Sequence, residues 1–171
     1  AGDRAARAVE VRLAPGEERM IDFFMVRPGG VLPDDTVLFE RGDHVWRVDT
    51  AGVQALDLTS DLQGAHRSPT WNGNRTEFAF IQRIPTRTQV LTRHPDGSPS
   101  RTIVDVPDSA SQLRWALDGR QMVYTHAAHH PDRGLVTELS WLDSYTGVQK
   151  ELVGGAEERI QIASLIRHDL T

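Results

Sequence analysis

The richest local cluster of reactive side chains lies just before Pro131. His126, His129 and His130 occur within five residues, and an aspartate follows Pro131. Imidazole nitrogens beside a carboxylate are ligands that zinc and other divalent metals accept. We therefore predict His126, His129 and His130 as candidate metal ligands in a loop between two strands. A polar loop before the proline accounts for the same residues without a ligand, because strand alternation would point His129 and His130 to opposite sides.

Motifs of the common enzyme classes are missing from the sequence. It contains no Gly-x-Ser-x-Gly elbow, no Gly-x-x-x-x-Gly-Lys phosphate loop, no His-Glu-x-x-His and no Gly-x-Gly-x-x-Gly. Carboxylates such as Asp105, Asp108 and Asp118 follow turn patterns, where solvated acids are the expected role. We therefore predict no catalytic residue and no cofactor.

Composition narrows the partner classes. The chain has 171 residues, 39% of them hydrophobic and 25% charged, which suits one folded domain with a core. The net charge of −5 and the alternation of positive and negative side chains argue against nucleic acid as a partner. No segment approaches the roughly 20 apolar residues of a membrane span. Cysteine is absent, which excludes disulfides and cysteine nucleophiles.

A repeat organises the middle of the chain. Trp71 and Trp115 lie 44 residues apart, and each is followed by an alternating apolar run and then by a tight turn. The turn pairs are Asn72-Gly73, Asp96-Gly97 and Asp118-Gly119, which are typical of β-hairpins. A period in this range marks solenoids and propellers. An earlier segment, 36–59, fits the same template as a third copy.

The repeat predicts the following strands. The innermost ones are 68–71 and 111–115, the second 76–81 and 121–126, the third 88–93 and 137–142, and the outer ones 100–106 and 148–153; the earlier unit supplies 36–40, 44–49 and 54–59. We expect an all-β fold of antiparallel four-stranded sheets.

These motifs carry a family resemblance. Trp115-Ala-Leu-Asp-Gly119, a strand ending in Asp49-Thr-Ala-Gly52, and the pair Leu58-Thr59 resemble the WD-like repeats of TolB-type β-propellers. The resemblance covers roughly residues 35–154. It implies β-propeller-like blades, about three in number. In such propellers a residue at the start of an innermost strand, such as His66, could face the mouth of a central channel.

Three blades are fewer than the four to eight that closed propellers have. We therefore expect an incomplete propeller, or one closed by oligomerisation or by pairing of the two termini. Segments 8–13 and 19–26 flank a Pro15-Gly16 turn and predict an N-terminal β-hairpin, which could complete a blade with residues 160–166. The predicted organisation is an N-terminal segment, 1–30, followed by propeller repeats over 31–171.

Tryptophans recur at equivalent places in the repeats. Trp46 and Trp141 fall on third strands, whereas Trp71 and Trp115 end innermost strands. Large aromatic side chains bury much area, so packing between blades explains this recurrence better than a sugar-binding or base-stacking platform. The remaining histidines, His44, His94 and His168, are expected at turns or on the surface.

The leading functional hypothesis is a non-enzymatic binding module of a bacterial propeller protein that contacts another protein through blade loops. It explains repeats without a catalytic signature. One alternative is the accessory propeller of a larger peptidase-type hydrolase, and another is a metal-dependent propeller lyase. The chain could be a homo-oligomer or part of a longer protein. We expect a periplasmic or extracellular location, and a cytoplasmic one stays open.

Overall fold

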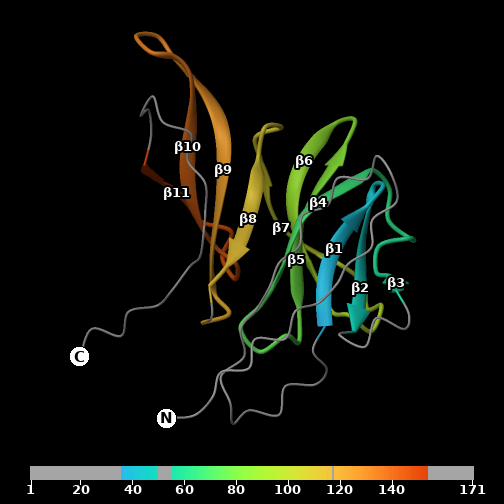
Figure 1. The fold of residues 1–171 in the computed structure, drawn as a ribbon. Coiled ribbons are helices and arrows are strands. Elements are labelled where there is room, and N and C mark those ends of the chain that lie inside the picture. The colour runs from blue at the N-terminus through green and yellow to red at the C-terminus, as the bar shows by residue number, and fades with distance from the viewer. Residues whose placement is uncertain (1–35, 50–54, 117, 154–171) are drawn as a thin grey trace, which may run out of the picture.

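The computed structural model describes residues 36–49, 55–116 and 118–153 (Figure 1). These residues form eleven antiparallel strands in three sheets. No helix in this part of the chain has the length and apolar character needed to cross a membrane.

The three sheets follow one another along the chain. Sheet A contains β1 (Thr36–Arg41), β2 (His44–Asp49) and β3 (Ala55–Asp57), in that order. Sheet B contains β4 (Ala65–Trp71), β5 (Phe78–Ile84), β6 (Arg87–Arg93) and β7 (Arg101–Val106). Sheet C contains β8 (Ser111–Trp115), β9 (Gln121–His130), β10 (Gly134–Asp143) and β11 (Gln149–Val153).

This architecture confirms the predicted fold class of propeller-like blades, since every predicted strand within 36–153 overlaps an observed one. The described sheets do not close into a ring. The predicted hairpin over 8–26 and the predicted strand over 160–166 lie outside the described residues, so the division into segments 1–30 and 31–171 stays a prediction.

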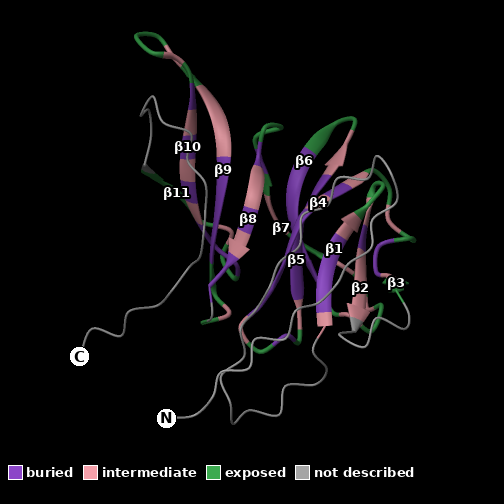
Figure 2. Ribbon diagram, in the orientation of Figure 1, coloured by how far each residue is buried: buried purple, intermediate pink, exposed green. Residues whose placement is uncertain are grey.

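Sheet B lies between two hydrophobic cores and is buried on both faces. Phe78 and Phe80 of β5 pack toward sheet A, while the alternate residues Ala79 and Ile81 pack toward sheet C. The first five residues of β5 are therefore all buried, as Figure 2 shows. Such double burial explains why β5 reads as a continuous apolar run and not as an alternating one.

The core on each side has its own composition. Between sheets A and B it is rich in aromatic residues and consists of Leu38, Val45, Leu58, Trp71, Phe78, Phe80 and Leu91. Between sheets B and C it is mostly aliphatic and consists of Ala79, Ile81, Val90, Val106, Ala110, Leu113, Trp115, Met122, Tyr124 and Leu142.

Sheets B and C repeat each other with a period of 44 residues. Trp71 pairs with Phe78 in sheet B, and Trp115 pairs with Met122 in sheet C. Both innermost strands contain a β-bulge three residues before the tryptophan, where Ser68 and Gln112 have positive φ angles of 53° and 51°. The sheets are also joined directly, because the Ser68 hydroxyl accepts a hydrogen bond from the Gln112 amide at 3.0 Å.

Candidate functional site

Three turns gather at one end of the sheets, together with the starts of β4 and β8. The His66 amide donates to the carbonyl of Asp43 in the β1–β2 turn at 3.0 Å. Near the β5–β6 turn, Arg83 Nη2 donates to the Ala110 carbonyl just before β8 at 2.8 Å. We call this end, with turn residues 42–43, 85–86 and 131–133, the turn face (Figure 1).

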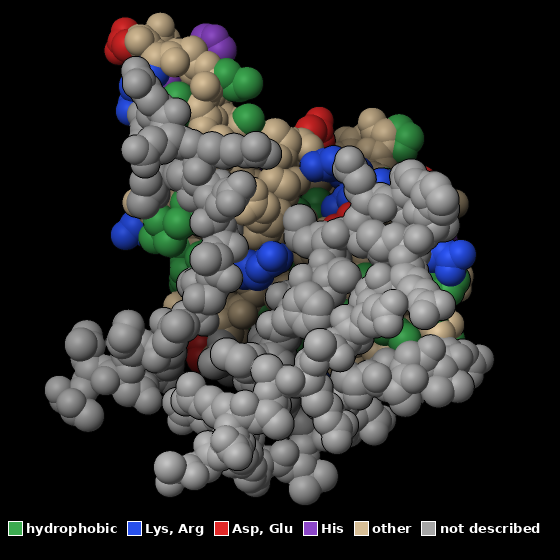
Figure 3. Space-filling view, in the orientation of Figure 1, with side chains coloured by type: hydrophobic (Ala, Val, Ile, Leu, Met, Phe, Trp, Pro, Cys, Tyr) green, Lys and Arg blue, Asp and Glu red, His purple; other side chains and the backbone are tan. Residues whose placement is uncertain are grey.

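The β9–β10 hairpin extends farther than the other hairpins of the turn face (Figure 1). Pairing of β9 with β8 ends at Thr125, whereas pairing with β10 continues to His130 and Gly134. We call residues 127–137 the arm. Figure 3 shows histidine side chains gathered at this end of the molecule, beside acidic and hydrophobic ones.

The predicted loop around the histidines is wrong, because His126 to His130 belong to β9. Four cross-strand pairs join this segment to β10 beyond His126. The turn itself is confined to residues 131–133. Proline lacks an amide hydrogen and ends the strand at Pro131.

Two of the three predicted ligands meet at a glutamate. Glu138 is 6% exposed, and its Oε1 lies 2.6 Å from His130 Nε2 while its Oε2 lies 3.5 Å from His126 Nε2. His126 Nε2 also lies 3.1 Å from the Ser140 hydroxyl. We call His126, His130 and Glu138 the histidine–glutamate cluster.

His129 lies on the opposite face of the hairpin and pairs with Leu135. Among the described residues, no group of three or more His, Asp or Glu side chains is positioned to hold a metal ion. The structure thus separates His129 from His126 and His130. Metal binding by these histidines stays a prediction that elemental analysis would test.

Sheet B has an amide pair where sheet C has the histidine–glutamate cluster. Gln82 and Gln89 face each other across β5 and β6, with Gln89 Nε2 donating to Gln82 Oε1 at 2.6 Å. The residue 44 positions after Gln82 is His126, and its cross-strand partner is Glu138. A neutral structural pair in one sheet is therefore replaced by titratable groups in the next.

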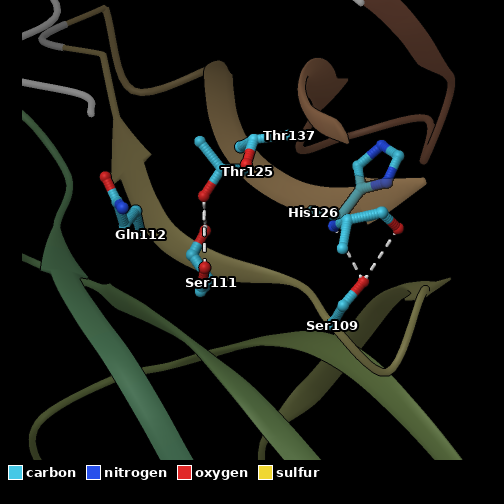
Figure 4. Close-up of a pocket in the computed structure, with 7 residues that line it drawn as sticks. Ser109, Ser111, Gln112, Thr125, His126 and Thr137 are labelled. Atoms are coloured by element: carbon cyan, nitrogen blue, oxygen red, sulfur yellow. Dashed lines mark hydrogen bonds between the residues drawn. The ribbon is translucent and has the colours of Figure 1, made fainter. Parts of the chain in front are cut away.

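A polar pocket of about 180 Å³ lies at the base of the arm. Its described lining residues are Ser109, Ser111, Gln112, Thr125, His126, Ala127 and Thr137 (Figure 4). The Ser109 hydroxyl accepts from the Ala127 amide at 2.9 Å and contacts the Ala127 carbonyl at 3.1 Å. Ser111 and Thr125 hydroxyls lie 3.1 Å apart. The pocket thus presents mostly uncharged donors and acceptors.

His66 does not face a channel mouth, contrary to the expectation from the sequence. It is fully buried, its Nδ1 lies 2.7 Å from the Asp43 carbonyl, and its ring packs edge-on against Phe80. Burial lowers the pKa of His66 below its ordinary value of 6.5. His66 therefore lies on the face of β4 that packs toward sheet A. Sequence spacing could not reveal this face, because the bulge between Arg67 and Thr70 interrupts the alternation of side chains along β4.

An ion-pair cluster joins β1 to β4 on the turn face. Glu40 Oε1 accepts a hydrogen bond from the Ser68 amide at 2.6 Å, and Arg67 pairs with Asp43 at 2.7 Å. Burial raises the pKa of Glu40, although the Ser68 bond and the charges of Arg67 and Arg83 oppose this effect. These groups hold one another, which indicates a structural role.

The tryptophans divide into two kinds. Trp71 and Trp115 are 1% and 4% exposed and belong to the two cores, as predicted. Trp46 of β2 and Trp141 of β10 are half-buried and lie outside both core clusters. The Arg41 guanidinium lies over the Trp46 ring at 5.2 Å.

Solved structures share this fold at low sequence identity. TolB from Acinetobacter baumannii matches with a TM-score of 0.54 and 16% identity over 71% of this chain and 27% of that one. An oligogalacturonate lyase in complex with manganese matches with a TM-score of 0.54 and 17% identity, over 68% and 32% of the two chains. A nidogen/laminin complex matches with a TM-score of 0.57 and 10% identity, over 71% and 45%.

These likenesses show a propeller-like fold of the TolB type and nothing finer. The chain spans less than half the length of each of these proteins. No protein-family model matches it, and no curated protein sequence does.

Proposed function

We propose that this chain is a non-enzymatic binding module that contacts another protein through its turn face, with the arm as the main contact. The observation that carries this proposal is the length of the arm and the exposure of its tip. β9 and β10 have ten residues each, whereas β5 and β6 have seven. Leu135, next to the turn, is 76% exposed.

An exposed apolar side chain among polar groups suits a binding contact. Interfaces draw most of their affinity from a few apolar or aromatic anchors with polar surroundings. Leu135 is bordered by His129 across the strand pair and by Thr137 on its own strand. The arm can therefore offer one apolar anchor without a large exposed patch.

The histidine–glutamate cluster supports a stiff arm. His126 approaches both Ser140 and Glu138 through the same ring nitrogen, Nε2. A serine–histidine–acid relay needs the two ring nitrogens to contact different partners. The contacts of His126 instead cross-link β9 and β10 at the base of the arm, which favours a structural role.

Affinity capture tests the proposal with a matched pair of variants. Leu135→Asp places a charge on the arm, and Leu152→Asp makes the same change on β11, where the leucine is 48% exposed. Extract of the source organism is passed over wild type and both variants, and captured proteins are quantified by mass spectrometry. We expect one protein to be enriched by wild type and Leu152→Asp, and reduced about tenfold on Leu135→Asp.

Equal enrichment on all three proteins would contradict a role for the arm. Loss on Leu152→Asp alone would move the contact to the outer edge of sheet C.

A further inference from the structure

The face of the arm that carries Leu135 continues into the polar pocket. Residues directly opposite in an antiparallel pair share a face, and faces alternate along each strand. Leu135 pairs with His129, Thr137 with Ala127, and Thr125 lies two residues before Ala127 on the same face. Thr125, Ala127 and Thr137 also line the pocket. The apolar tip and the pocket therefore form one continuous surface.

The pocket exists because sheet C has small residues where sheet B has large ones. Arg67, Ile81 and Arg83 of sheet B correspond, 44 positions on, to Ser111, Thr125 and Ala127. In sheet B these positions are filled, since Ile81 packs into the core facing sheet C and Arg83 reaches the Ala110 carbonyl.

The edge of β9 above the pocket carries main-chain groups that face outward. Main-chain groups alternate between the two sides of a strand in an antiparallel sheet. Thr125 faces the β8 side, where it pairs with Ser111, and Ala127 faces that side because both its amide and carbonyl contact the Ser109 hydroxyl. His129, two residues on, therefore faces the same way, and no described strand pairs with it there.

We propose that this surface binds an extended segment of a partner protein, added as a strand along the β9 edge. The proposal rests on the proposed binding function and names the form of the partner. A strand is the occupant because the available groups at His129 are a main-chain donor and acceptor, which an extended chain satisfies by adding to a sheet edge.

Side chains of the segment would meet two different environments. The side chains that line the pocket include serine and threonine hydroxyls and one carboxamide, without a carboxylate or guanidinium, so the pocket suits an uncharged polar side chain. Leu135 lies on the same face nearer the tip and suits an apolar one. Alternate residues of a strand point to one face, so two such side chains separated by an intervening residue fit this surface.

The test has two steps. Peptides that bind the wild-type chain are selected first, and their binding is then measured on variants in which the pocket is filled by side chains copied from the equivalent positions of sheet B. A phage-displayed library of random twelve-residue peptides is selected on the wild-type chain, and the dissociation constants of selected peptides are measured by calorimetry. Thr125→Ile and Ala127→Arg restore the side chains found at Ile81 and Arg83. Thr102→Ile makes the same threonine change at an exposed position on β7 and serves as the control. Near-ultraviolet circular dichroism verifies that each variant is folded.

We expect selected peptides to bind about tenfold more weakly to Thr125→Ile and to Ala127→Arg, and unchanged to Thr102→Ile. Failure to enrich any peptide, or equal binding to all variants, would overturn the proposal. A dimer detected by light scattering for wild type and abolished in Leu135→Asp would mean that a second copy of the chain covers this surface, and it would overturn the proposal as well. The binding function itself would survive these failures if Leu135→Asp still lost the captured protein, so the two proposals fail separately.

Discussion

Sheets B and C follow one pattern up to a single cross-strand row and differ beyond it. Both place a buried tryptophan at the end of the innermost strand, and both precede it with a bulge at a residue of positive φ. Beyond the row of Gln82 and Gln89, sheet B ends after two more pairs, whereas sheet C continues for four beyond His126 and Glu138. The shared part is the scaffold of the fold, and the departures of sheet C mark the candidate site.

At the row itself, His126 and Glu138 of sheet C stand where Gln82 and Gln89 stand in sheet B. The side chains differ in chemistry, although their positions in the two sheets are equivalent. In sheet B, Gln89 donates a neutral hydrogen bond to Gln82, and Gln82 donates one to the Gln63 carbonyl. In sheet C a buried carboxylate takes their place and requires donors, which His126 and His130 provide. His126 belongs to this row and His130 to the arm, so the histidine–glutamate cluster joins the arm to the scaffold.

The largest expected difference is in the free energy of unfolding, between a substitution in the scaffold and one in the arm. Phe80→Ala should lower the free energy of unfolding by about 3–5 kcal/mol, because it removes a fully buried ring from the core between sheets A and B. Leu135→Ala, on the exposed arm, should change it by less than about 0.5 kcal/mol. Chemical denaturation measures both. Similar losses in the two variants would break the comparison.

A smaller loss of stability is expected from substitutions in the row of His126 and Glu138. Glu138→Ala removes the acceptor that His126 and His130 share and should cost about 1–3 kcal/mol of stability. The double variant H126Q/E138Q recreates the glutamine pair of sheet B and should cost less than the single change. Denaturation curves of the two proteins decide the order. The reverse order would show that the two rows are not interchangeable.

The pH dependence of stability should contain a contribution from His66 in sheet B. Its folded pKa lies below 6.5 because of burial, opposed by the Asp43 carbonyl, while the nearby His44 lowers it further and Asp57 raises it. The unfolded chain therefore takes up a proton below about pH 6.5 that the folded chain does not. Stability should fall as the pH drops from 6.5.

Comparison with His66→Gln isolates this effect from the other histidines. The difference in unfolding free energy between wild type and variant should shift against wild type between pH 7.5 and pH 5.5. A difference that is constant over this range would show that His66 titrates equally in both states.

A modest contribution to the pH dependence of stability is also expected from a carboxyl group, that of Asp143 in sheet C. Hydrogen bonds from the Thr146 and Tyr145 amides and from Arg120 lower the pKa of Asp143 from 3.8 to about 2. The unfolded carboxyl binds a proton before the folded one, so this stabilisation is present above about pH 4 and is lost as the pH falls through 2. Asp143→Asn should be less stable than wild type at pH 7, and the difference should vanish near pH 2. A difference that persists at pH 2 would contradict it.

Local signals in the sequence were sufficient to predict the blades. Gly73, Gly97 and Gly119 follow Asn or Asp in hairpin turns, and the 44-residue spacing of Trp71 and Trp115 sets the repeat. Turn chemistry and strand alternation act over a few residues, so they can be read without knowledge of the fold. Each predicted strand inside the described ranges was found for this reason.

The candidate site depended on pairing, which local signals do not contain. Glu138 meets His126 because β9 and β10 continue in register to His130, and the sequence indicated a loop there. The equivalence of Gln82 and His126 was a signal that could have predicted it, since a histidine at the place of a buried glutamine needs a partner across the strand. His66 was misplaced because a bulge between it and Trp71 breaks simple alternation.

The division into scaffold and arm is tested most directly by a variant in which sheet C is given the turn and the glutamine row of sheet B. Its unfolding free energy and its capture of the partner are measured. The variant replaces residues 129–135 by Pro-Thr, the turn of β5–β6, and carries H126Q/E138Q to complete the row. We predict an unfolding free energy within about 1 kcal/mol of wild type, since the deleted side chains are exposed or half-buried, together with loss of the captured partner. Destabilisation of about 3 kcal/mol or more, or full retention of the partner, would contradict the division into scaffold and arm.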